Sequence, residues 1–153
     1  MENATIAKFS LTSSAIQDGQ AIPMEYTCDG ANQAPPLAWG DPPAGTKSLA
    51  LVVDDPDAPR GTFHHWGAYD IPASARSLEA GTFEESTNDF GKPGYGGPCP
   101  PKGHGLHHYR FKLFALDVDR LGLGADAKIA DLAKEAEKHA LGRAELTGTY
   151  ERK

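Results

Sequence analysis

The chain has 153 residues, the size of one domain, and its 17 glycines and 12 prolines lie among apolar runs, which favours ordered turns over disorder. Its formal net charge of −6 argues against a broad nucleic-acid-binding surface but leaves room for one small anion pocket. Residues 1–10 lack a charged-then-apolar leader and no apolar run reaches about 18 residues, so we expect a cytoplasmic protein without a membrane span, with Cys28 and Cys99 reduced.

Strands are the main predicted elements along the chain. Each candidate is a short apolar run or an alternating segment bounded by turn residues. The candidates are residues 9–11, 48–53, 65–71, 109–116 and 144–150. Asp54-Asp55-Pro56 reads as a turn that ends the second candidate. The Gly- and Pro-rich stretch 81–105 predicts a long ordered loop, which is often functional.

One amphipathic helix is predicted between Asp126, a capping residue, and Gly142, a C-terminal stop. Its apolar stripe consists of Ile129, Leu132, Ala133, Ala136 and Ala140. Many strands with one late helix predict a mainly β fold, a two-sheet antiparallel β-sandwich with a helix in its C-terminal region and long ordered loops. We expect residues 1–153 to form a single domain.

The first segment that carries chemistry is residues 55–66. Its prolines stiffen the loop and aim its side chains, and the Ala58–Pro59 bond is open to either cis or trans. If a strand begins at His65, then His64 and Trp66 point to the opposite face. One histidine can then face a pocket while Trp66 packs in the core.

The second segment is residues 94–110. Its glycines would let backbone amides approach an anion closely. On an extended backbone His107 and Tyr109 share a face and form a donor pair, while His108 points away. A carboxylate from Asp55 or Asp57 beside His65 or His107 would favour the charged, doubly donating imidazole. Each of these histidines also fits the ordinary role of a partly exposed loop residue.

Together these segments resemble the phosphatidylethanolamine-binding protein (PEBP) family, in its bacterial Raf-kinase-inhibitor-like branch. The shared motifs are Asp55-Pro56-Asp57-Ala58-Pro59, His65-Trp66, Gly97-Pro98-Cys99-Pro100-Pro101 and Gly105-Leu106-His107-His108-Tyr109. Further matches are Tyr26-Thr27-Cys28-Asp29-Gly30, Pro35-Pro36-Leu37-Ala38-Trp39, Asn88-Asp89-Phe90-Gly91 and residues 144–150. His108 departs from the pattern, because the family often has arginine there.

The resemblance implies a PEBP-like fold with a small pocket for phosphate or related anions. Its ligand-binding residues would be Asp55, Asp57, Pro59, His65, Gly97, Pro101, Leu106, His107 and Tyr109. The function implied is non-catalytic and regulatory, with a phospholipid head group or a phosphorylated residue as ligand and no cofactor. A kinase or protease partner and a homodimer are further implications. If His65 or His107 must be protonated to hold the anion, affinity weakens as pH rises.

Two enzymatic alternatives stay open. A metalloenzyme could use His104, His107, His108 and Cys99, although no spacing matches Cys-x-x-Cys or His-Glu-x-x-His. A hydrolase could use Cys99 or a serine as nucleophile, although no Gly-x-Ser-x-Gly elbow occurs.

Overall fold

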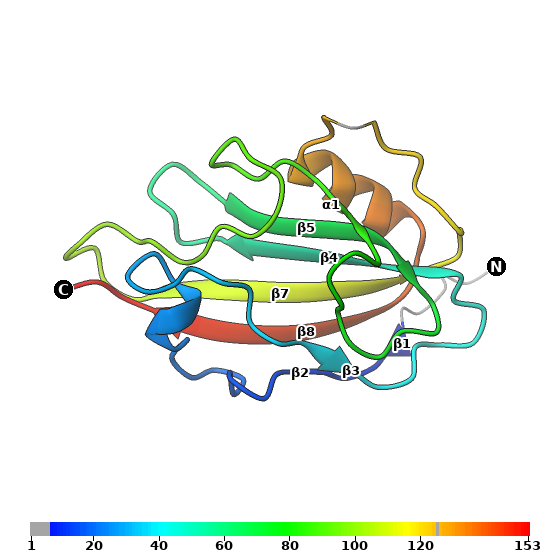
Figure 1. Ribbon diagram of the computed structural model, residues 1–153, viewed down its shortest axis with the longest axis horizontal. Helices are drawn as coiled ribbons and strands as arrows, with labels where there is room; N and C mark the ends of the chain where they lie inside the picture. Colours follow the sequence, from blue (N-terminus) through cyan, green and yellow to red (C-terminus); the bar gives the residue numbers. More distant parts are fainter. Residues whose placement is uncertain (1–6, 125) are drawn as a thin grey trace.

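The fold is built on a six-stranded sheet with the strand order β1-β8-β7-β4-β5-β6 (Figure 1). The computed structural model describes residues 7–124 and 126–153. Residues 1–6, which belong to the N-terminal segment considered above as a possible leader, lie outside the described residues. β1 pairs with β8 in parallel, and the other neighbours in this sheet are antiparallel. The elements in order are β1 (Ala7–Lys8), β2 (Leu11–Thr12), the 3₁₀ helix η1 (Met24–Tyr26), β3 (Ala38–Trp39), β4 (Ser48–Asp55), β5 (Phe63–Pro72), β6 (Glu84–Glu85), β7 (His107–Leu116), α1 (Ile129–Lys138) and β8 (Ala140–Tyr150).

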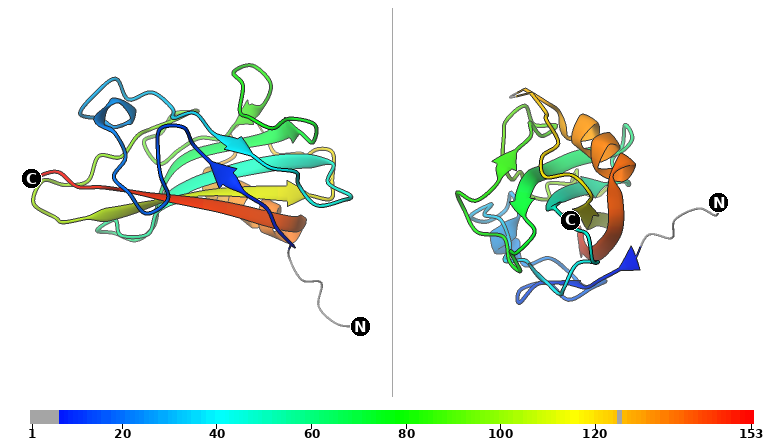
Figure 2. Two further views of the ribbon diagram at one scale, coloured as in Figure 1. Left: turned by 90° about the horizontal axis from the view of Figure 1, so that it is seen from below. Right: turned by 90° about the vertical axis from the view of Figure 1, so that its right-hand side faces the viewer.

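The two faces of the large sheet have different covers. α1 packs on one face, while the small sheet of β2 and β3 and the segment around η1 lie on the other (Figure 2). The mainly β fold with one helix and long loops agrees with the prediction. The sandwich arrangement stays a prediction, because the second sheet has only two strands of two residues each.

β4 is the central strand, and all eight of its residues are buried. It lies between β5 and β7, and its side chains alternate between two core clusters. Leu49, Leu51 and Val53 face the β2–β3 side, whereas Ala50 and Val52 face α1. Burial on both faces explains why this strand reads as a continuous apolar run in the sequence.

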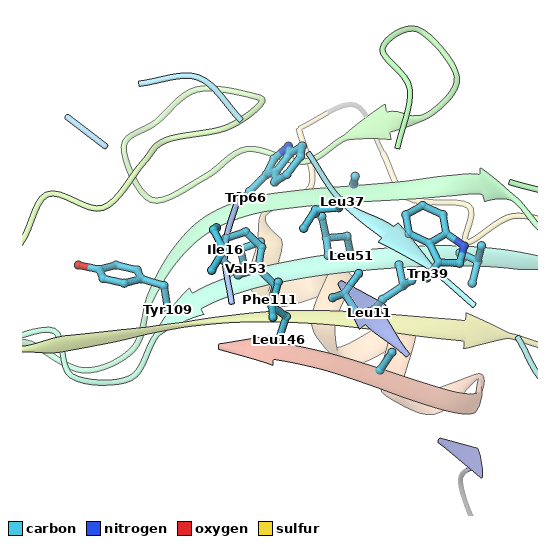
Figure 3. Packing of buried hydrophobic residues seen from close by; sticks show 14 of the residues in the cluster. Leu11, Ile16, Leu37, Trp39, Leu51, Val53, Trp66, Tyr109, Phe111 and Leu146 are labelled. Atoms are coloured by element: carbon cyan, nitrogen blue, oxygen red, sulfur yellow. The ribbon is translucent and has the colours of Figure 1, made fainter. Parts of the chain in front are cut away.

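The larger core cluster fills the space under β2 and β3 (Figure 3). Tyr109 lies at the margin of this cluster, and its ring extends away from the other labelled residues with the hydroxyl outermost. On the opposite face, Gly67 of β5 lets α1 approach closely. A Cβ at this position would lie 2.8 Å from Leu132 Cδ2 and 2.9 Å from Ile129 Cγ1.

The helix prediction was right in place but wrong at both ends. α1 begins after Lys128, which makes no side-chain capping bond, so Asp126 is not the cap. It ends at Lys138, and Ala140 already belongs to β8, where it pairs with Leu116 of β7. Pairing with β7 therefore begins β8 two residues before Gly142. Gly142 lies within β8 and does not end the helix.

The strand predictions were also short at their ends. The run predicted at 48–53 continues through Asp54 and Asp55, since both carboxylates find partners in the interior. The strand predicted at 144–150 begins at Ala140, and that at 109–116 begins at His107. Residues 9 and 10 lie between β1 and β2 and are not in a strand.

A register shift in β5 overturns the expected orientation of Trp66. Val53 pairs with Trp66 and Asp54 with His64, so the pairing passes over His65. A bulge of this kind places two consecutive side chains toward one face. The His65 ring lies 5.2 Å from the Tyr109 ring, and Trp66 belongs to the same core cluster as Tyr109. His65 therefore lines the pocket while Trp66, the next residue, stays in the core.

Candidate functional site

A pocket of about 200 Å³ lies where β4 ends beside the first residues of β5 and β7. Antiparallel pairing brings the C-terminal end of β4 against the N-terminal ends of its two neighbours. Residues 58–59 and 99–101 supply loop walls to this pocket. Its lining is Asp55, Ala58, Pro59, Phe63, His65, Phe90, Cys99, Pro100, Pro101, His107 and Tyr109.

Asp55 orients one of the two pocket histidines. Its Oδ2 lies 2.6 Å from His107 Nδ1, and both side chains are almost completely buried. Its Oδ1 accepts a hydrogen bond of 2.8 Å from the backbone N–H of Asp57. Because a carboxylate only accepts, His107 carries a proton on Nδ1. The buried carboxylate thus has a partner on each oxygen and fixes the ring of His107.

His65 is held by the backbone of the second loop. Its Nδ1 lies 2.7 Å from the carbonyl oxygen of Gly96, and the N–H of Gly96 donates to the His65 carbonyl at 3.0 Å. Burial lowers the pKa of His65 below its ordinary value, and the bond to the Gly96 carbonyl opposes this only in part. The neutral ring therefore carries its proton on Nδ1, which leaves Nε2 with a lone pair.

Tyr109 presents an unpaired hydroxyl. The residue is only 1% exposed, and none of the described residues forms a hydrogen bond of good geometry with its hydroxyl, although the Asp55 carboxylate lies near it. Burial, and then the charge of Asp55, raise the pKa of the phenol above its ordinary value, so the group stays a donor. Buried hydroxyls are nearly always hydrogen-bonded, so this one is available to a bound molecule.

The remaining walls are apolar and poor in donors. Pro59, Pro100 and Pro101 have no backbone N–H. The glycine amides expected to cradle an anion are in part already used: the N–H of Gly96 donates to His65, that of Gly97 to Asn32 Oδ1 at 2.9 Å, and that of Gly103 to the Arg152 carbonyl. For these three glycines the expected amide cradle is wrong, since their N–H groups hold the loops in place.

Residues 12–151 match the family model described as phosphatidylethanolamine-binding protein. The chain belongs to the phosphatidylethanolamine-binding protein family. A UPF0098 protein of Aquifex aeolicus is 47% identical over 148 residues, which covers 92% of this chain and 86% of that protein. The UPF0098 protein of Methanothermobacter thermautotrophicus is 43% identical over 152 residues, covering 94% and 99%. The family resemblance inferred from the motifs is therefore confirmed.

The crystal structure of Escherichia coli YbcL, described as a new member of the mammalian PEBP family, superposes with a TM-score of 0.91. It is 34% identical in sequence, and the match covers 96% of this chain and all of that chain. At this similarity the whole arrangement of strands, helix and long loops is that of a PEBP family member.

The resemblance seen in the sequence motifs predicted nine site residues, and the structure brings six of them to the pocket wall. They are Asp55, Pro59, His65, Pro101, His107 and Tyr109. Asp57 turns instead toward His108, whose backbone N–H and Nδ1 both lie 2.8 Å from Asp57 Oδ2. This hydrogen bond to His108 lowers the pKa of Asp57. The carboxylate that serves a pocket histidine is therefore Asp55 and not Asp57.

The other two PEBP-type positions, Gly97 and Leu106, lie outside the pocket lining. Gly97 packs against the carbonyl of Tyr26 and the side chain of Asn32, where any Cβ would collide. Leu106 is 52% exposed on the surface. Neither lines the cavity of this PEBP family member.

Five lining residues were not among the predicted anion-binding residues: Ala58, Phe63, Phe90, Cys99 and Pro100. Phe63 shares the strand of His65 and could have been included once the strand was extended by two residues. Phe90 had no such signal, because it comes from the long loop and reaches the pocket only by folding back, with its ring 4.8 Å from that of Phe63.

The prediction that Cys28 and Cys99 are reduced is wrong. They form a disulfide with a Cα–Cα distance of 5.4 Å across a separation of 71 residues. The N–H of Cys28 donates to the carbonyl of Pro98, which sets the two segments side by side. Cys99 therefore has no thiol to act as a nucleophile, and the thiol state lends no support to a cytoplasmic location.

His104 and His107 contact each other, but His108, the third candidate metal-binding histidine, turns away from them. His108 turns to Asp57, while His107 turns to Asp55. Within residues 7–124 and 126–153, no group of three or more His, Cys, Asp or Glu side chains could hold a metal ion. In the same described part of the chain, no helix is long and apolar enough to cross a membrane. The Ala58–Pro59 bond is trans, as are all described peptide bonds.

Proposed function

We propose that the chain binds a small phosphate-type anion in the pocket at the end of β4 and acts without catalysing a reaction. A phospholipid head group and a phosphorylated residue both present this group. The family description, phosphatidylethanolamine-binding protein, supports a ligand that bears a phosphate.

The unpaired hydroxyl of Tyr109 is the observation that carries this proposal. A buried donor without a partner costs about 1–3 kcal/mol, so its place in a pocket wall favours an acceptor brought by a ligand. An oxyanion is such an acceptor and accommodates several donors at once. The rings of His65 and His107 line the same pocket, with centroids 5.2 Å and 6.4 Å from that of the Tyr109 ring.

The lining supports binding more than chemistry. It contains no serine, threonine or lysine, and the sulfur of Cys99 is in a disulfide. The phenol of Tyr109 has a raised pKa and is a poor nucleophile at neutral pH. Asp55 is engaged on both oxygens. These features favour a regulatory binding protein over a hydrolase.

The test is calorimetric titration of wild type and Tyr109→Phe with inorganic phosphate. We expect the variant to bind about tenfold or more weakly, which corresponds to about 1.4 kcal/mol for one lost hydrogen bond to a charged acceptor. Its free energy of unfolding should not fall, since the hydroxyl has no hydrogen-bond partner among the residues that the structure describes.

Tyr150→Phe is the matched control, because the Tyr150 hydroxyl donates to Asp29 outside the pocket. This variant should bind phosphate like wild type. Equal affinity of wild type and Tyr109→Phe, or no phosphate binding by wild type at millimolar concentration, would sink the proposal.

A further inference from the structure

His107 has a second hydrogen-bonding contact, on the nitrogen that does not face Asp55. Its Nε2 lies 2.6 Å from Nδ1 of His104, with the two ring centroids 4.9 Å apart. His104 is an exposed residue in the loop that leads into β7. Two imidazole nitrogens at this distance must have a proton between them, because two lone pairs would repel each other.

The number of protons in this pair is limited. Nδ1 of His107 keeps its own proton for the acceptor Asp55. The neutral pair needs His104 to donate from Nδ1, and the singly charged pair can carry its extra proton on either ring. A doubly charged pair would set two N–H groups against each other. The closed contact therefore holds one positive charge at most.

We propose that His104 is a positioning residue of the pocket: it shares one proton with His107 and so limits the two rings to a single positive charge beside Asp55. Its role toward an anion rests on the proposed function, whereas the proton sharing does not. The pair and Asp55 together then carry a charge of zero when the proton is bound and −1 when it is lost. An oxyanion is accepted more readily in the first state.

Other ionisable groups lie on the elements next to this pair. Asp57 follows β4 and is paired with His108, and its carboxylate senses the charge of His107. His65 of β5 and Tyr109 of β7 line the same pocket. Lys102 precedes the loop of His104, and Arg152 accepts the N–H of Gly103 on its carbonyl.

Imidazole resonances of ¹⁵N-histidine-labelled protein, followed against pH without any anion, test the proton sharing directly. The chain has 6 histidines, few enough to assign by substitution. In wild type we expect His104 and His107 to shift together in a first step and again in a second step at lower pH, separated by about one pH unit or more. In His104→Ala, His107 should titrate in one step.

His104→Asn separates proton sharing from hydrogen bonding. The asparagine amide can still donate to Nε2 of His107 but cannot take up a charge, so one step is again expected. His108→Ala, which removes a neighbouring exposed histidine from the other side of the strand, should keep the two linked steps. A single, independent His107 step in wild type, unchanged in His104→Ala, would overturn the proposal.

Phosphate titrations at several pH values extend the test to the anion. In wild type the pH at which affinity falls should coincide with the first step of the pair, and in His104→Ala it should move with the new His107 midpoint. If the pH dependence of phosphate affinity is the same in His104→Ala as in wild type, the role of His104 at the anion is overturned. If wild type binds no phosphate at any pH, the proposed function and that role both fail, while the ring titration alone decides the proton sharing.

Discussion

Asp54 and Asp55 are consecutive buried carboxylates at the end of β4, yet the two faces of the sheet give them opposite surroundings. Asp54 contacts Arg110 Nε at 2.8 Å and Lys112 Nζ at 2.9 Å, both from β7. Asp55 contacts the imidazole of His107 in the pocket. Arginine and lysine stay charged at physiological pH, whereas histidine does not. The end of β4 thus carries, on one face, an ion cluster whose charges do not change near neutral pH. On the other face it carries an Asp–His pair whose charge can change.

The difference separates a structural use of a buried charge from a functional one. The Asp54 cluster is complete without any further molecule, because each carboxylate oxygen has its own cation. The Asp55 face keeps an unpaired hydroxyl on Tyr109 and an imidazole lone pair on His65. Its polar groups are completed only when a ligand arrives, in the function proposed above.

Reduction of the Cys28–Cys99 disulfide, which lies at the pocket on the Asp55 face, is the largest expected perturbation. Opening a loop of this length lowers the free energy of unfolding by about 4 kcal/mol in the chain-entropy model. Phosphate affinity should fall too, since Cys99 lines the pocket. Urea unfolding of wild type with and without reductant measures the first effect. A Cys28→Ser, Cys99→Ser double variant should have the unfolding midpoint of the reduced wild type, and reductant should not change it. Equal wild-type midpoints with and without reductant would contradict the expectation.

Asp54→Asn and Asp55→Asn should divide stability from binding. Asp54→Asn leaves two cations without their carboxylate, but Arg110 and Lys112 are partly exposed, so we expect a loss of about 2 kcal/mol, below the range for fully buried pairs. Its phosphate affinity should stay within about twofold of wild type. Asp55→Asn should weaken phosphate binding about tenfold, because an amide can donate to His107 Nδ1 and disturb its proton arrangement; we expect this loss to exceed the gain from removing a negative charge.

Urea unfolding and phosphate calorimetry on both variants give the comparison. The distinction between the two faces would fail if Asp54→Asn lowered phosphate affinity as much as Asp55→Asn does.

The smallest effect concerns pH and His65. Its folded pKa is lowered by burial, so the unfolded chain binds the proton first as pH falls below about 6.5. Stability should therefore drop with falling pH between about 6.5 and the folded pKa, by up to about 1.4 kcal/mol per pH unit for this one proton. Because His65 lines the pocket, this dependence belongs to the pocket face.

Urea unfolding of wild type and His65→Asn across this pH range isolates the contribution, because the other histidines are common to both proteins. A wild-type curve parallel to that of His65→Asn would mean that the buried ring causes no acid destabilisation. Saturating phosphate should reduce the wild-type loss, since an anion favours the protonated ring.

Simple alternation was enough to place part of the site from the sequence. His107 and Tyr109 lie on one face of β7 and both line the pocket, as their spacing predicts. The same rule failed at His65 and Trp66, because the register shift beside Val53 depends on pairing with a distant strand. No local pattern in the residues around His65 encodes that shift.

Other features required knowledge of long-range contacts. Asp55 and Asp57 both lie in the same motif, and only the path of the chain after β4 decides which carboxylate meets His107 and which meets His108. The disulfide joins segments 71 residues apart, and an inference about the cell compartment had suggested free thiols. The helix end at Lys138 was hidden because the apolar stripe runs on into β8 without interruption.

The disulfide also divides the molecule mechanically. Between Cys28 and Cys99 the chain forms a closed covalent ring that contains β4 and β5, whereas β7 and β8 lie outside it. A pulling force on the two termini is transmitted through the disulfide and not through the chain inside the ring. The protein therefore cannot extend by the length of that chain, which is about 240 Å at about 3.4 Å for each of its 71 residues. Asp55 and His65 lie within this ring, whereas His107 and Tyr109 lie outside it, so the pocket is built from both the part of the chain that would bear the load and the part that would not.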